Sequence, residues 1–147
     1  MKMRLLLTGV VLGALLAPLS CCALMSIAEI HLGQAQELGV EVRTTPAGDD
    51  TLWIELEVKT DGTLENFDHV SMAIKQDGRT LVSYVQLREK RLDADRVSVR
   101  FLANRCYVDK ITLRIVAGTP MNRVGYDVKL NDFIDLEKGD KAERSEK

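Results

Sequence analysis

The stretch Leu52-Trp53-Ile54-Glu55-Leu56-Glu57-Val58 alternates strictly, with the aliphatic residues at every second position. Successive side chains of a β-strand point to opposite faces, so this pattern predicts a strand with one face in a core and the other in solvent. The same alternation recurs six more times along the chain and predicts a domain built of seven strands. The other runs are residues 38–42, 70–74, 81–87, 97–101, 111–115 and 124–130.

Turn-forming residues separate these runs. Asp77-Gly78 stands between two of them, and this dipeptide readily supplies the positive φ angles of a two-residue type I′ hairpin turn. Residues 70–74 and 81–87 are therefore expected to form a tight hairpin. The predicted domain contains no stretch of ten or more residues with a helical period, which argues against α/β architectures.

Short strands spaced by turns over roughly 100 residues favour a seven-stranded antiparallel immunoglobulin-like β-sandwich. A small closed barrel is the alternative. The resemblance is to an architecture and not to a family, because the cysteine and tryptophan spacing of antibody domains is missing. A chain of 147 residues, 46% of them apolar, suits one globular domain after a targeting segment.

The N-terminus has the order of a secretory signal. Lys2 and Arg4 precede an apolar run over residues 5–17, and small residues follow up to Ala23. Cleavage after Ala23 or Ala28 is one expected outcome. An uncleaved anchor is another, because residues 5–28 are long enough to span a bilayer.

The same region resembles a bacterial lipoprotein signal, in which a Leu, a small residue and a Gly or Ala precede the Cys that becomes lipidated. Leu19-Ser20-Cys21 before Cys22 fits the first two positions, whereas the residues before Cys21 fit only the last. The resemblance implies lipidation at Cys22 or Cys21. Acyl chains would then anchor the protein stably in a membrane.

The sequence divides into four predicted segments. Residues 1–28 are a signal peptide or membrane anchor, 29–36 a tether or one loose helical turn, 37–136 the β-sandwich domain and 137–147 a disordered charged tail. The expected location is the periplasm, the cell envelope or the exterior of a bacterium, with the N-terminus as a potential membrane attachment.

No motif predicts a catalytic, cofactor-binding or metal-binding site. A net charge of −2 with interspersed signs argues against nucleic acid as a partner. Asp68 and His69 lie near Ser71 and Ser83, but no nucleophile motif accompanies them. A hydrolytic or metal-dependent enzyme with residues scattered over loops is the alternative to a non-catalytic binding or structural module.

Three residues are candidates for partner binding. The alternation places Trp53 on the outward face of its strand, and it places Tyr84 and Arg88 on the outward face of another strand. Trp53 could instead fold over a sheet edge beneath a loop. The partner would be another envelope protein or a surface ligand, met by this patch or by strand addition at an open edge. Cys106 is expected to be a small buried hydrophobic residue.

Overall fold

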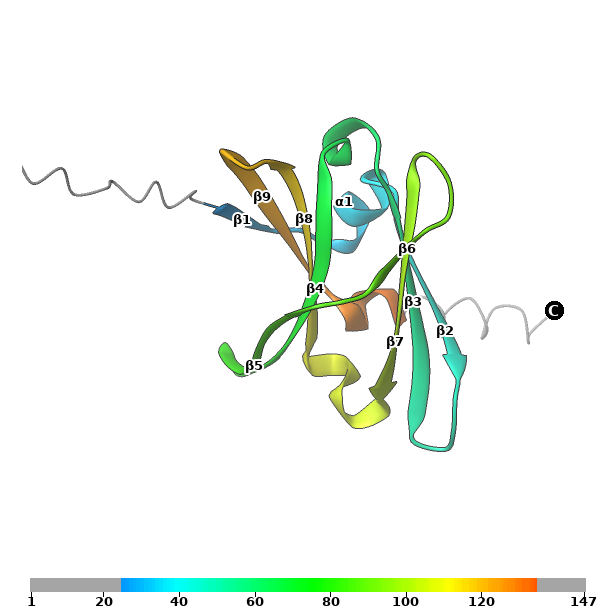
Figure 1. Cartoon of the computed structure of the whole chain (residues 1–147). Coiled ribbons are helices and arrows are strands. Elements are labelled where there is room, and N and C mark those ends of the chain that lie inside the picture. The colour runs from blue at the N-terminus through cyan, green and yellow to red at the C-terminus, as the bar shows by residue number, and fades with distance from the viewer. Residues whose placement is uncertain (1–24, 135–147) are drawn as a thin grey trace, which may run out of the picture.

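Two β-sheets pack face to face in the computed structural model, which describes residues 25–134 (Figure 1). The five-stranded sheet consists, in spatial order, of β1 (Met25–Glu29), β9 (Asn122–Lys129), β8 (Ile111–Thr119), β4 (Phe67–Gln76) and β5 (Arg79–Gln86). The four-stranded sheet consists of β2 (Val40–Pro46), β3 (Thr51–Lys59), β7 (Arg96–Asn104) and β6 (Glu89–Arg91). The predicted all-β sandwich is therefore confirmed at the level of two packed sheets.

The number of strands differs from the sequence-based expectation. All seven alternating runs form strands, but β1 and β6 raise the number in residues 25–134 to nine. β6 escaped notice because it is only Glu-Lys-Arg, and β1 because its composition continues that of the apolar leader. The sandwich is also not purely antiparallel, since β1 pairs with β9 in parallel.

The segment expected to be a tether or one loose helical turn contains a short helix. Helix α1 (Leu32–Glu37) starts at His31, whose backbone N–H donates to the side-chain oxygen of Gln34 at 3.0 Å. It ends at Glu37, and Gly39 just beyond it, with a φ of +76°, turns the chain into β2. Ala35 of this helix is fully buried in the core. Residues 30–37 therefore contribute to the packed structure.

The N-terminal and C-terminal predictions lie largely outside the described residues. These are the leader up to residue 24, including Cys21 and Cys22, and the tail over 137–147. Within residues 25–134, no helix has the length and apolar character needed to cross a membrane. The other short helices there are η1 (Gly62–Leu64), η2 (Arg105–Lys110) and residues 130–134.

The core lies between the two sheets, and the alternation predicted its members. Ile54, Leu56 and Val58 on β3 are completely buried. Trp53, which directly precedes Ile54 and points to the opposite face, is exposed. Leu113 and Ile115 on β8 supply the opposite layer. Each fully buried side chain of this kind contributes about 1.5–3 kcal/mol relative to exposure, so the fold needs no disulfide to hold the layers together.

The predicted hairpin between β4 and β5 is confirmed. Asp77 and Gly78 have φ angles of +50° and +74°, as a type I′ turn requires. The β4–β5 register shifts between Met72 and Ile74 and again between Ile74 and Lys75. β5 is thus an irregular edge strand at one side of the five-stranded sheet.

Candidate functional site

An ion pair crosses the outer face of the five-stranded sheet. Arg114 on β8 lies opposite Asp127 on β9, and its Nε and Nη2 donate hydrogen bonds to the two carboxylate oxygens at 2.6 and 2.9 Å. Asp127 is only 5% exposed. Gly125 gives the Arg114 side chain room, because a Cβ there would lie 3.1 Å from Arg114 Cδ.

Two further strands supply donors to the same carboxylate. The Tyr84 hydroxyl on β5 donates to Asp127 Oδ2 at 2.6 Å, and Lys75 Nζ on β4 lies 3.3 Å from that oxygen. The Arg114 guanidinium also stacks 3.6 Å from the centroid of the Tyr84 ring. Four strands are therefore joined through Asp127, Arg114, Tyr84 and Lys75, which we call the Asp127 network.

The protonation states within this network follow from its contacts. Burial raises the pKa of Asp127, but hydrogen bonds from Arg114 and Tyr84 outweigh it, so the pKa lies below its ordinary value. Burial and the hydrogen bond to Asp127 raise the pKa of Tyr84. Asp127 is thus ionised and Tyr84 neutral at pH 7. With each of its oxygens accepting from nearby donors, the carboxylate serves to bind strands together.

A hollow of about 540 Å³ opens beside the network. Its lining mixes cations such as Lys110 and Lys129 with carboxylates such as Glu29, Asp109 and Asp132. Residues 25–134 contain no cluster of three or more His, Cys, Asp or Glu side chains that could hold a metal ion. The mixture of signs favours no single class of ligand.

The β5 edge exposes apolar side chains. Leu81, Val82 and Val85 are 57%, 41% and 51% exposed, and β5 is the last strand on its side of the sheet. Val82 and Val85 pair with Ile74 and Met72, which pack against the core. They therefore have the orientation of core residues, at a place where no other layer covers them.

The outer face of the four-stranded sheet carries the second apolar patch. Trp53 on β3 lies opposite Leu102 on β7, and the two are 37% and 51% exposed. The guanidinium of Arg100 stacks 4.4 Å from the centroid of the Trp53 ring. Trp53 is thus partly covered by a cation on the neighbouring strand.

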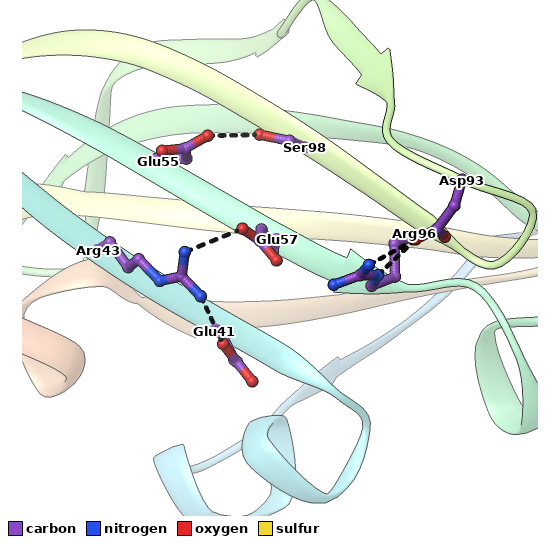
Figure 2. A network of polar contacts seen from close by, with 7 residues as sticks. All are labelled: Glu41, Arg43, Glu55, Glu57, Asp93, Arg96 and Ser98. Carbon is purple, nitrogen blue, oxygen red and sulfur yellow. Dashed lines mark hydrogen bonds and ion pairs between the residues drawn. The ribbon is translucent and has the colours of Figure 1, made fainter.

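Charged residues occupy the rest of this face (Figure 2). Arg43 on β2 contacts Glu57 at 3.3 Å and Glu41 at 3.4 Å, and Ser98 Oγ donates to Glu55 at 3.1 Å. These groups alternate with the buried residues of the same strands. Arg43 lies just beyond the predicted strand over residues 38–42, so its pairing with two glutamates was not expected from the alternation.

The three residues predicted to bind a partner do not share one surface. Trp53 lies on the four-stranded sheet, and Tyr84 lies on the five-stranded sheet with its hydroxyl on Asp127. Arg88 is exposed just beyond β5, where the chain crosses from one sheet to the other. Asp127 was missed because alternation reports the face on which a residue lies but not its partners.

Two other candidates have different outcomes. His69 Nδ1 lies 3.1 Å from Asp68, yet neither Ser71 nor Ser83 hydrogen-bonds to that imidazole among the described residues. The predicted burial of Cys106 is wrong, because this residue is exposed on η2. Val108 occupies the buried position of that helix.

Comparison with protein-family models, with curated proteins and with solved structures found no match to this chain. The geometry of the described residues therefore supplies the basis for any functional proposal.

Proposed function

We propose that this chain is an exported, non-catalytic binding module of the bacterial cell envelope that captures a protein partner by strand addition along β5. The observation that carries this proposal is the open β5 edge with Leu81, Val82 and Val85 exposed. Unpaired edges template further pairing, and proteins ordinarily blunt them with charges or cover them. Three exposed aliphatic residues on such an edge favour a partner there.

The strand order supports an immunoglobulin-like topology for this module. The order β2-β3-β7-β6 corresponds to strands A-B-E-D of that fold, and β9-β8-β4-β5 corresponds to G-F-C-C′. Cys106 is the single cysteine of residues 25–134, and β4 carries no tryptophan. The disulfide and buried tryptophan of antibody domains therefore have no counterpart.

The Asp127 network would keep the edge ready for binding. Tyr84 is the β5 residue that reaches across the sheet, and its hydrogen bond to Asp127 ties β5 to β9. A strand held in one conformation loses less conformational entropy when a partner pairs with it. Tyr84 thereby acts as a positioning residue and not as the contact itself.

The environment of β5 indicates the chemistry of the partner. Val82 and Val85 point to the core side without a covering layer, so a segment continuing the sheet would place apolar side chains beside them. Arg79 begins the strand and Arg88 lies two residues beyond it; both are exposed and form no ion pair with another described residue. We therefore expect an extended segment with alternating apolar residues and a carboxylate near one end.

Trp53 and Leu102 provide the second candidate surface. An exposed aromatic residue stacked with arginine is typical of interface hot spots, and Arg100 makes no ion pair with another described residue. This patch has two exposed apolar residues instead of three and is bordered by paired charges such as Arg43 and Glu57. It therefore ranks behind the β5 edge. Metal-dependent catalysis has no cluster of three or more His, Cys, Asp or Glu side chains in residues 25–134 to support it.

Photo-crosslinking of the protein in the bacterial envelope tests which of the two surfaces binds the partner. A photoreactive amino acid in place of Leu81 is expected to trap a discrete protein adduct, and Val82→Lys should abolish it because a charge on the edge opposes pairing. Leu102→Lys, which places the same charge on the other sheet, is the matched control and should leave the adduct unchanged. An adduct that persists with Val82→Lys would contradict strand addition at β5, and an adduct formed by the same photoreactive residue at Leu102 but not at Leu81 would move the interface to the Trp53 face.

A further inference from the structure

One end of the five-stranded sheet combines the start of β1 with the β8–β9 hairpin. Because β1 runs parallel to β9, Met25 lies beside Arg123, one residue after the pair that closes the hairpin turn. Pro120 and Met121 form the tip, between the paired residues Thr119 and Asn122. The two segments lie next to each other on the left of Figure 1.

This end of the sheet exposes three large apolar side chains. Met121 is 77% exposed, the largest value among the exposed large hydrophobic residues, and Ile27 and Met25 are 52% and 37% exposed. The register places Met25 and Ile27 on the same outer face as Arg123. Neither residues 25–28 nor residues 117–124 contain a carboxylate, and the Asp68 carboxylate on β4 is paired with Arg123 at 3.4 Å.

The position of the leader indicates what covers this surface. The apolar run over residues 5–17 and the two candidate lipidation cysteines precede β1 directly, with Cys22 three residues before Met25. An extended chain spans at most about 3.6 Å per residue, so a membrane-anchored Cys22 would hold the start of β1 within about 11 Å of its anchor. A long tether would let the domain rotate away from the membrane. Here β1 is paired with β9 from Met25 onward, so only the residues between Cys22 and Met25 separate the anchor from the sheet.

We propose that this end of the sandwich, made of Met25, Ile27 and the Met121 hairpin tip, contacts the lipid surface of the membrane that holds the leader. The proposal rests on the export proposed above and on retention of the N-terminus in the membrane, by lipidation or as an uncleaved anchor. Met121 would enter the boundary between headgroups and acyl chains, and the anchor would supply the high local concentration that a small apolar contact needs. The β5 edge, at the opposite side of the same sheet, would remain open to a protein partner.

The test uses the full-length chain, taken from bacterial membranes and reconstituted into vesicles of phosphatidylethanolamine and phosphatidylglycerol with a photoactivatable phospholipid. Trypsin releases residues 115–123, which carry the hairpin tip, and residues 106–110, which lie at the opposite end of β8 and carry the 45%-exposed Tyr107. Lipid adducts are expected to be several-fold more frequent on 115–123. Met121→Asp should reduce them several-fold while the chain stays in the vesicles.

Two results would overturn the proposal. Equal adduct yields on both peptides, with the chain still vesicle-bound, would mean that the anchor holds the domain without orienting it. Recovery of the mature chain in the soluble fraction would also reject membrane contact. Neither result affects the photo-crosslink at Leu81, so failure of the lipid contact is distinguishable from failure of the binding function.

Discussion

Arg114 and Asp127 join β8 to β9 through two hydrogen bonds on the outer face of their sheet, with the two side chains only 12% and 4% exposed. A paired and nearly buried ion pair adds little net stability, but removal of one partner leaves an uncompensated charge. The Asp127 network therefore makes β5 dependent on a residue in β9.

Replacement of Asp127 by Asn is expected to destabilise the fold by about 3 kcal/mol, because Arg114 keeps its charge and loses its counter-ion. Urea unfolding followed by Trp53 fluorescence measures the change. Asp61→Asn is the control, since the Asp61 pair with Lys59 is about half exposed and should matter by less than about 1 kcal/mol. Equal losses in the two variants would contradict the structural role of the network.

Acid should weaken the fold through the same carboxylate. The pKa of Asp127 is lowered in the folded state, so its contribution is complete above the unfolded value of 3.8 and is lost as the pH falls through the lower folded value. Stability of the wild-type chain should therefore fall more steeply below pH 4 than that of Asp127→Asn. Parallel pH curves for the two proteins would show that Asp127 does not titrate as its contacts require.

Gly125→Ala is expected to cost about 1 kcal/mol, because the new Cβ would crowd Arg114 at 3.1 Å and disturb its alignment with Asp127. Thermal unfolding provides the measurement. Gly33→Ala, in helix α1, is the matched control: a Cβ there has no neighbour within 4 Å, and the change should be neutral or slightly stabilising. A neutral Gly125→Ala would imply that Arg114 moves freely.

Processing of the N-terminus should leave β1 intact. A cut after Ala28 would remove all of β1 except Glu29 and expose the edge of β9. Intact mass spectrometry of the mature chain should therefore find a start at or before Met25, either a free Leu24, an acylated Cys22 or Cys21, or an intact Met1. A mature chain starting at Glu29 would contradict this expectation, as would equal melting temperatures for chains starting at Leu24 and Glu29.

Much of the sandwich could be predicted from the sequence, because burial of one face of a strand imposes a period of two on its apolar residues. That period identified seven strands, most of the core on β3 and β8, and the Asp77-Gly78 turn. The strands β1 and β6 could not be predicted from this period. One has the composition of the leader before it, and the other is a three-residue charged strand held by pairing with β7.

Most of the candidate site could not be predicted from the sequence. Tyr84 and Trp53 were identified as outward residues, but their assignment to different sheets depends on where the chain crosses between layers. Lys75, Tyr84 and Asp127 are up to 52 positions apart in the chain. Only the pairing of β4, β5, β8 and β9 brings them together.

The amino-acid sequence alone determined which side of each strand faces the core, because that choice is a local consequence of alternating side chains. Tertiary structure alone decided which outward residues meet, since register and strand order depend on the packing of the whole sandwich. For this reason Asp127 could be placed on a face from its neighbours, whereas its hydrogen bonds with Arg114 and Tyr84 required the assembled sheet.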